Sequence, residues 1–344
     1  MKQLEEKIRD AADRTLPLRL RGGGTKDFYG NAPSGEVLDT RGYAGIVAYE
    51  PTELVITARC GTPLSELENI LGKENQFLPF EPPHFGAGAT VGGCVAAGLS
   101  GPRRAAAGAL RDYVLGAKII DGRGRVLTFG GQVMKNVAGY DVSRLMAGAL
   151  GTLGLIAEVS LKVLPRPVEE RTLALELGEG DALSAMARWA SQPLPMSATA
   201  WHDGKLLVRL SGSAPAVRAA AAKIGGSPVD VPWEAIREHR HPFFAGPGPL
   251  WRIALPAALP PLPTKNSFLE WNGMQRWVLS DAPASEIREM ARRAGGHATL
   301  FRRGDGSVPV FAPLEPVLAR LHREVKAAFD PAGIFNPGRL VREP

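Results

Sequence analysis

The chain has 344 residues, of which 44% are hydrophobic and 22% charged, so it is long enough for two domains and too apolar for extended disorder. Its formal net charge of +6 comes from scattered basic residues, and aromatic residues are only 7%, which argues against a nucleic-acid-binding protein. The two isolated cysteines, Cys60 and Cys94, are too few for a Cys₄ zinc site or an iron–sulfur cluster.

The N-terminal segment 1–14 predicts a charged amphipathic helix without the apolar core of a signal peptide. The apolar runs elsewhere are short and are broken by Gly or charged residues, so none is expected to span a membrane. The sequence therefore predicts a cytoplasmic protein without structural disulfides, whose membrane association, if it has any, comes through partner subunits.

The stretch RLRGGGTK, residues 19–26, places three consecutive glycines between an arginine and a threonine. Glycine costs stability in regular structure, so such a run indicates a tight turn, positive φ, or close approach of a ligand to backbone N–H groups. A surface turn and an anion cradle both remain open here. The flanking Arg21 and Lys26 favour the cradle.

The next elements alternate between strands and helices. Strands are predicted at 45–51 and 53–61, and a helix at 62–75 with Thr62 or Ser65 near its cap. After the glycine-rich segment 81–101 the pattern predicts a hairpin over 113–130, turning at Asp121-Gly122. A helix over 137–150 and a long strand over 154–165 complete this half.

The segment 81–101 carries the second group of glycines. It is not a dinucleotide fingerprint, because Gly86, Gly88 and Gly92 have GxGxxxG spacing and follow no strand, and GGGTK does not match a Walker A loop. Two separate glycine-rich loops would suit a ligand with a diphosphate and flat ends. Tight packing of small residues at a helix entry is the alternative.

From residue 168 onward the composition changes, and all six Trp lie between Trp189 and Trp277. Two successive strand–helix groups predict an antiparallel sheet with helices on one face. A helix over 315–329 and the apolar, Gly/Pro-punctuated tail 330–340 close the chain. We expect that tail to pack back onto the first half.

Five stretches together resemble the vanillyl-alcohol-oxidase, or PCMH-type, family of FAD-binding flavoproteins. Within it, EPPHF, GPRRAAAGALRDYVLG and MKNVAGYDVSRLM are most similar to the FAD-binding, E-type subunits of bacterial glycolate oxidases. The five stretches are 21–25, 79–93, 98–131, 134–167 and 329–340. The resemblance implies an α+β fold with a two-subdomain FAD-binding domain (1–167), a smaller α+β cap domain (168–312), and a C-terminal helix and tail (313–344) that return to the FAD domain.

The resemblance also implies which residues bind FAD. The first loop would wrap the pyrophosphate through backbone N–H groups, the second would line the flavin ring, and the later positions would extend that wall to the adenine side and the tail. The cofactor-binding residues implied in this way are Arg21, Gly22, Gly23, Gly24, Thr25, Ala89, Thr90, Gly92, Gly93, Gly98, Leu99, Gly108, Gly154, Ile156 and Asn336.

The implied function is that of an FAD-dependent oxidoreductase subunit in a complex that oxidises glycolate, a small 2-hydroxy acid, to glyoxylate. The implied partners are a larger flavin subunit of the same family and an iron–sulfur subunit. Two alternatives stay open: a flavin-binding assembly subunit without chemistry of its own, and a stand-alone flavin oxidase of another small hydroxy acid.

The chain departs from the wider family at several positions. Thr25 stands where some members link FAD to a histidine, so non-covalent FAD is expected. The histidine and metal pair of 2-hydroxy-acid oxidising relatives has no counterpart, and we expect no metal and an exposed loop at His239 and His241. His84 and Arg104 are the candidate catalytic residues. Lys135 and Asn136, farther along the chain, are either polar residues that hold a loop in place or contacts of the flavin site.

Overall fold

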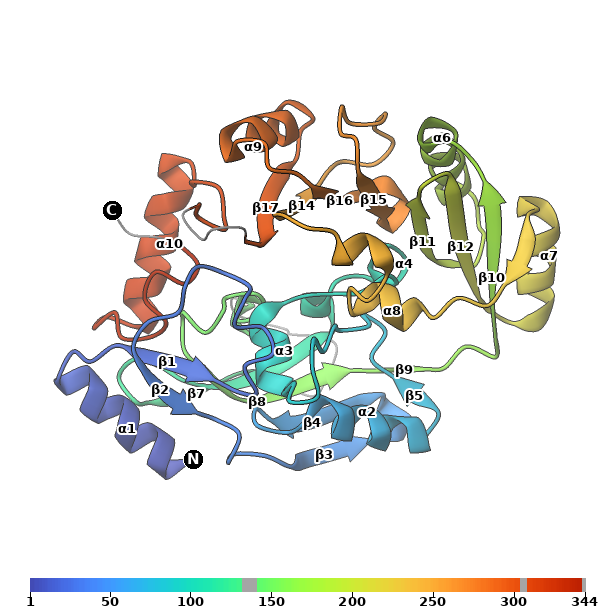
Figure 1. Cartoon of the computed structure of the whole chain (residues 1–344). Coiled ribbons are helices and arrows are strands. Elements are labelled where there is room, and N and C mark those ends of the chain that lie inside the picture. The colour runs from blue at the N-terminus through green and yellow to red at the C-terminus, as the bar shows by residue number, and fades with distance from the viewer. Residues whose placement is uncertain (132–140, 304–307, 342–344) are drawn as a thin grey trace.

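The computed structural model describes residues 1–131, 141–303 and 308–341. It is an α+β structure with one antiparallel sheet in the first half of the chain and another in the second (Figure 1). This confirms the predicted fold class.

The first sheet has five strands and forms the base of the molecule. Its strand order is β3-β4-β8-β6-β7, and every pairing is antiparallel. The bounds are β3 (Ile46–Glu50), β4 (Val55–Arg59), β6 (Val114–Ile120), β7 (Val126–Gly130) and β8 (Leu155–Lys162). Strand β8 lies in the centre and is buried along all but its last residue, as expected for a strand paired on both edges and covered on both faces.

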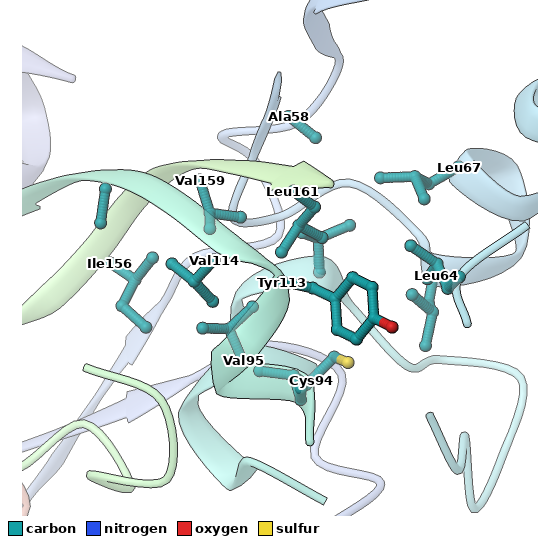
Figure 2. Close-up of a cluster of buried hydrophobic side chains, with 14 of the residues drawn as sticks. Ala58, Leu64, Leu67, Cys94, Val95, Tyr113, Val114, Ile156, Val159 and Leu161 are labelled. Atoms are coloured by element: carbon teal, nitrogen blue, oxygen red, sulfur yellow. The ribbon is translucent and has the colours of Figure 1, made fainter. Parts of the chain in front are cut away.

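Helices α2 (Leu64–Lys73) and α3 (Val91–Ala97) cover one face of this sheet. Figure 2 shows the resulting core, in which side chains of both helices meet those of the central strands around the ring of Tyr113. Each fully buried aliphatic side chain in such a core contributes about 1.5–3 kcal/mol. The labelled members are Ala58, Leu64, Leu67, Cys94, Val95, Tyr113, Val114, Ile156, Val159 and Leu161.

Smaller elements surround the base. Helix α1 (Lys2–Asp13) buries Ile8 against the parallel pair β1 (Leu18–Arg21) and β2 (Glu36–Asp39). The remaining short elements of this half are β5 (Gln76–Phe77), which pairs with β9 (Leu164–Pro165), helices α4 (Arg104–Ala107) and α5 (Val142–Leu145), and 3₁₀ turns at Pro51–Glu53 and Leu110–Tyr113.

Three local predictions differ from the structure. The hairpin between β6 and β7 has a five-residue loop, 121–125, because Asp121 exchanges backbone bonds with Arg125 and Gly124 instead of closing a two-residue turn. Pro63 occupies the N-cap of α2 without a side-chain bond, since the Thr62 hydroxyl bonds to Gly45. Described helix in 137–150 is confined to α5, and 137–140 lie outside the described residues.

The second sheet has eight strands in the order β13-β10-β12-β11-β15-β16-β14-β17, all antiparallel. The bounds are β10 (Glu169–Glu176), β11 (Met196–His202), β12 (Lys205–Gly212), β13 (Ser227–Val229), β14 (Leu250–Ala254), β15 (Ser267–Glu270), β16 (Gln275–Leu279) and β17 (His297–Arg302). The predicted strands and the predicted antiparallel sheet are confirmed.

The two faces of this sheet have different partners. Helices α6 (Glu179–Ala190), α7 (Ala214–Ile224) and α9 (Ala284–Arg293) pack on the outer face (Figure 1). The inner face carries Phe268, Trp277 and Phe301 and packs on Leu99 of the first half. Helix α8 (Trp233–Arg237) and 3₁₀ turns at Pro242–Ala245 and Trp271–Gly273 lie in the connections.

Charged side chains also join the two halves. Arg209 of the second sheet donates to Glu81 at 2.8 Å, and Arg103 of the first half donates to Glu170 at 2.6 Å. Both arginines are nearly enclosed, so each charge depends on its partner for compensation. The two sheets are therefore held in a fixed relation over the space between them.

Helix α10 (Pro316–Phe329) runs back toward the first half, and the tail follows it (Figure 1). The first strand of the second sheet begins at Glu169, shortly after β9 ends at Pro165. The domain boundaries at 167 and 312 stay a prediction.

Candidate functional site

The first glycine loop follows β1 and is pressed against the second. A Cβ atom at Gly23 would overlap the backbone carbonyl of Gly88, and one at Gly22 would overlap the side chain of Thr90. Gly24 has a φ of +74°, which is strained for other residues. The backbone is bare because two loops meet in contact, a condition that a simple surface turn would not impose.

The second glycine loop leads into α3. Thr90 is the N-cap residue, and its hydroxyl accepts a bond from the Gly93 N–H at 3.3 Å. The helix ends after seven residues at Gly98, whose φ is +63° and whose missing Cβ leaves room for the backbone of Gly148. Small residues are therefore required at both ends of α3 by backbone contacts.

The two loops and the C-terminal tail enclose a cleft, here called the glycine cleft, with about 600 Å³ of unfilled space including its open mouth. Eight of the fifteen residues predicted to bind cofactor lie along it. Its lining is Arg19, Leu20, Arg21, Gly22, Gly23, Gly24, Thr25, Lys26, Asp27, Pro33, Thr90, Gly93, Ala96, Ala97, Leu150, Asn336 and Arg339.

Cations outnumber carboxylates along the glycine cleft by four to one. Arg19 and Arg21 share the carboxylate of Asp27 at 2.5 and 2.9 Å. Lys26 instead donates to the backbone oxygen of His84 at 3.1 Å, and no carboxylate of the described residues lies within ion-pair distance of it. Burial lowers the pKa of Lys26, as expected for an ammonium group that neighbouring negative charges do not fully compensate.

The tail closes the glycine cleft from the other side. The Asn336 side chain accepts from the Leu20 N–H at 2.8 Å and donates to the Leu150 carbonyl at 2.6 Å. Phe335 is completely buried, and Arg339 donates to the backbone oxygen of Asp27 at 3.0 Å. The expectation that the tail packs back onto the first half is confirmed.

These features fit a diphosphate-containing cofactor. A bare backbone allows phosphate oxygens to approach N–H groups closely, and the excess of cations balances their negative charge. The residues that would hold such a group are the backbone of 22–25 and the side chain of Lys26. Leu150, Ala96 and Ala97 offer an apolar wall beside them.

The other seven predicted cofactor residues lie outside the glycine cleft. They are Ala89, Gly92, Gly98, Leu99, Gly108, Gly154 and Ile156. Ile156 lies in the core of the first sheet (Figure 2), and Gly154 packs against the Ile120 carbonyl. Leu99 lines a different cavity, described next. The cofactor contacts of all fifteen residues stay a prediction.

The second cavity lies under the inner face of the eight-stranded sheet and is here called the cap-sheet cavity. It contains about 310 Å³ of unfilled space including its mouth. Its lining is Pro83, Phe85, Leu99, Ser100, Gly101, Pro102, Ile236, Arg237, His239, Arg252, Glu270, Gln275, Trp277 and Phe301. Its floor continues the α3 wall of the glycine cleft, since Ala97 and Leu99 are two residues apart.

Arg252 and Glu270 are the two side chains of this cavity whose charge is not compensated. Arg252 donates to the Tyr29 hydroxyl at 3.3 Å and has no carboxylate partner in the described part of the chain. Glu270 is buried and accepts from Trp277 and Gln275 at 2.6 and 3.0 Å. Burial raises the pKa of its carboxyl to about 7.

The two histidines expected on an exposed loop are half-buried against aromatic side chains instead. The His239 ring stacks on Phe244 with centroids 4.0 Å apart and contacts Trp277 and Phe301. Burial lowers the pKa of His239 to about 3, so the imidazole is neutral. His241 contacts Phe268. The expectation was wrong because an aromatic cluster buries the segment that follows α8.

Neither of the two candidate catalytic residues belongs to the lining of the glycine cleft or of the cap-sheet cavity. The His84 ring bonds to Glu68 of α2 at 3.0 Å, and its backbone N–H bonds to Glu238. The Arg104 guanidinium lies over the Trp271 ring at 4.5 Å. These contacts, outside the two cavities described, favour structural roles. Lys135 and Asn136 lie outside the described residues.

Both cysteines are buried, and burial raises the pKa of Cys94 to about 12 and that of Cys60 to about 11. Neither is a thiolate available for covalent attachment. Across residues 1–131, 141–303 and 308–341, no three His, Cys, Asp or Glu side chains form a group suited to a metal ion. No helix in these ranges has the length and apolar character needed to cross a bilayer.

Sequence reasoning missed Arg252, Glu270 and Arg339 as site residues. Arg252 and Glu270 lie on different strands of a long-range sheet, and no local spacing relates them. For Arg339 a signal existed, because it lies three residues after Asn336 in the tail that was expected to pack back onto the first half.

Comparison with protein families gives two matches. Residues 1–130 match the family described as FAD binding domain, and residues 313–340 match FAD linked oxidases, C-terminal domain. These two regions contain both glycine loops and the tail that together line the glycine cleft.

Two curated relatives show how far the similarity extends. The glycolate oxidase subunit GlcE of Escherichia coli (strain K12) is 48% identical over 99% of this chain and 97% of its own length. The glycolate oxidase subunit GlcD of Bacillus subtilis (strain 168) is 30% identical over 47% of this chain and 35% of its own length.

A solved structure shares the fold at low sequence similarity. The alkyldihydroxyacetonephosphate synthase structure aligns over 98% of this chain and 76% of its own, with a TM-score of 0.67 and 15% identity.

Proposed function

The chain belongs to the family of E-type glycolate oxidase subunits, and from this premise we propose that it is the FAD-binding redox subunit of a glycolate oxidase complex. Its cofactor is FAD, and it is an FAD-linked oxidoreductase subunit. In the proposed complex glycolate is oxidised to glyoxylate and the electrons leave through partner subunits. When bound, FAD supplies a two-electron acceptor.

One observation carries the placement of the cofactor: the glycine cleft combines bare backbone at 22–25 with an excess of cations. We propose that the FAD diphosphate lies against this backbone, with Lys26 as its nearest uncompensated cation. Thr90 and Gly93 then line the path of the cofactor along α3, and Asn336 fixes the tail beside it.

We propose that FAD is bound non-covalently. Thr25 offers no imidazole for a covalent link, and the buried thiol of Cys94 is protonated. Acid precipitation of the purified protein tests this point. Flavin released into the supernatant is the expected result, and flavin that stays with the pellet would contradict it.

We propose two kinds of partner, a larger flavin subunit of the same family and an iron–sulfur subunit. The relatives GlcE and GlcD are both named as glycolate oxidase subunits, which supports an assembly of more than one chain. The two cysteines of this chain are buried and unpaired, so an iron–sulfur centre would have to be bound by another chain. A cytoplasmic location stays a prediction.

The test follows the visible absorption of FAD in the assembled complex after glycolate is added. Bleaching of the flavin of this chain, distinguished by loading it separately before assembly, supports the redox role. Oxidation of glycolate by the complex while this flavin stays oxidised would instead support the second candidate, a flavin-binding assembly subunit. The position of His84, bonded to Glu68 outside both cavities, is the observation that favours that candidate.

The isolated chain is expected not to oxidise glycolate at a useful rate. Hydride removal needs a base within hydrogen-bond reach of the hydroxyl, and the histidine candidate is engaged elsewhere. Steady-state oxidation with an artificial acceptor, compared between the FAD-loaded chain and the complex, measures this. Equal turnover by the isolated chain would favour a stand-alone oxidase.

A further inference from the structure

We propose that the cap-sheet cavity binds a small monocarboxylic acid that carries an oxygen on its second carbon. Arg252 holds the carboxylate, and Glu270 donates a hydrogen bond to that oxygen. The identity of the acid as glycolate or glyoxylate rests on the proposed function, whereas the existence of the site rests on the cavity alone.

Arg252 has the surroundings expected of a side chain that binds an anion. It lines the cavity from β14, and its one polar partner in the described structure is the Tyr29 hydroxyl. The positive charge of Arg252 helps to lower the pKa of Arg104 and of His239, so its neighbourhood already carries cationic or neutral groups. A guanidinium presents paired donors that match a carboxylate.

Glu270 lines the same cavity from β15, and its surroundings favour a neutral carboxylic acid instead of a charged group. Both of its hydrogen bonds end on Oε2, which leaves Oε1 for the cavity that the residue lines. No described cation lies within ion-pair distance of this carboxyl, and Glu81 adds negative charge nearby. The surroundings therefore favour the protonated acid, which can donate to a ligand oxygen.

The register of the sheet sets the distance between these two groups. Arg252 pairs with Trp277, and Glu270 pairs with Gln275, two residues farther along β16. Two strand spacings of about 4.8 Å and two residues of about 3.4 Å separate the two Cα atoms by on the order of 12 Å. The two side chains therefore reach the cavity from opposite sides of Trp277, which lines it between them.

The charges around the cavity select a monoanion. Arg237 also lines it but is paired with Glu238 at 2.8 Å, and His239 is neutral. Among the described side chains that line the cavity, Arg252 is the cation without a carboxylate partner and Glu270 is a neutral acid, so a single carboxylate balances the lining. A dicarboxylate would leave one negative charge buried without a partner, at a high desolvation cost.

The same balance makes binding depend on pH. Ionisation of Glu270 puts a second negative charge beside the ligand, with Glu81 near it, and Arg252 is the cation of the described cavity lining that has no carboxylate partner. The affinity should then fall about tenfold between pH 6 and pH 8, as for one group that titrates near pH 7 and binds ligand only when protonated.

Isothermal titration of the FAD-loaded full chain with glycolate, without oxygen or acceptor, tests the site. Arg252→Met should weaken binding at least thirtyfold, while Arg171→Met, which removes a paired arginine from β10 of the same sheet, should not change it. Glu270→Gln should bind with the same affinity at pH 6 and pH 8. Acetate, which lacks the second oxygen, and malonate should both bind more weakly than glycolate.

Undiminished glycolate binding by an Arg252→Met protein that melts like the wild type would overturn the proposal, as would malonate binding as tight as that of glycolate. If Arg252→Met does not fold, the pH dependence of wild type and Glu270→Gln decides instead, and a tenfold fall retained by Glu270→Gln rejects the site. Flavin absorbance recorded in the same samples reports reduction separately. Binding without reduction, even in the complex, would contradict the proposed function alone, and reduction in the complex without binding to this chain would contradict the site alone.

Discussion

The glycine cleft and the cap-sheet cavity are lined by neighbouring residues at the end of α3, Ala97 and Leu99, but are built in opposite ways. The glycine cleft is made largely of backbone, with Gly23 packed directly against the backbone of Gly88. The cap-sheet cavity is made of large side chains, such as Trp277, Phe301 and Arg252, that project from sheet strands. The first site offers N–H groups and fixed positive charge, and the second offers shape and titratable groups.

This difference determines which kind of substitution should disrupt each site. A backbone cradle has no spare volume, so an added methyl group displaces the loops themselves, whereas loss of one side chain leaves its N–H groups in place. In a cavity lined by side chains the opposite is expected, because truncating one side chain removes a functional group while the backbone of the sheet stays in place. The predictions below test that contrast, from the largest expected effect to the smallest.

Removal of the tail should have the largest effect, because it takes one wall from the glycine cleft. Truncation after Phe329 removes the buried residues Ile334 and Phe335 together with the Asn336 bonds to Leu20 and Leu150. We expect a loss of about 5 kcal/mol or more in the free energy of unfolding, and loss of bound flavin. Denaturant melts and the flavin-to-protein absorbance ratio measure both.

The matched control is Val317→Ala on the exposed side of α10, which should change stability by less than about 0.5 kcal/mol. A truncated protein that keeps its full flavin content would show that the tail does not contribute to the cofactor site.

The contrast also explains what the sequence could predict. Both glycine loops and the tail are local patterns whose residues have to be small or polar for local reasons, and eight of the predicted residues do line one cleft. The antiparallel sheet of the second half was predicted from two successive strand–helix groups and was confirmed. Arg252 and Glu270 could not be predicted, because the register of three strands, and not their spacing in the chain, brings them to one cavity.

The same limit applies inside the first half. Ile156 was placed at the cofactor by resemblance. Its side chain lies in the core of the first sheet (Figure 2), and a contact of its backbone with the cofactor stays a prediction. His239 was placed on an exposed loop because its neighbours are charged. The aromatic residues that bury it, Phe244, Trp277 and Phe301, come from three separate segments.

Gly23→Val should abolish flavin retention. Its Cβ would overlap the Gly88 carbonyl, so the two loops have to separate, and overpacking of this kind costs about 1–3 kcal/mol in stability. Gly42→Val is the matched control, since nothing lies within 4 Å of its added Cβ and its φ is not positive. Flavin content after gel filtration is the measurement, and normal flavin in a folded Gly23→Val protein would refute the backbone cradle.

Glu270→Gln should change how stability depends on pH. The pKa of Glu270 is about 7 in the folded protein and about 4.5 when unfolded, so the folded state binds the proton more tightly. Its contribution to stability is therefore present below pH 4.5 and is lost as the pH rises toward 7, with a total of about 2–4 kcal/mol.

The Gln variant keeps the two hydrogen-bond donors, Trp277 and Gln275, satisfied and lacks this titration. Urea melts of both proteins at pH 5 and pH 8 should show the wild type losing more stability between the two values. Parallel pH curves would mean that Glu270 ionises normally, and that the cap-sheet cavity is more polar than its burial indicates.

Lys26→Met should have the smallest effect of the four substitutions and truncations. It separates the contribution of the backbone N–H groups to FAD binding from that of the Lys26 side chain. The N–H groups of 22–25 remain, so FAD should still bind, but about tenfold more weakly, as expected for loss of one charge-assisted hydrogen bond. Because burial lowers the pKa of Lys26 and a bound diphosphate would raise it again, wild-type affinity should also fall as the pH rises through that lowered pKa.

Arg41→Met, which removes an exposed arginine paired with Asp39, controls for the loss of one positive charge. Fluorescence titration of the apoprotein with FAD at low and high pH measures both effects. Unchanged affinity in Lys26→Met would leave the backbone as the whole anion site, and a loss as complete as that of Gly23→Val would mean that the cradle depends on one side chain after all.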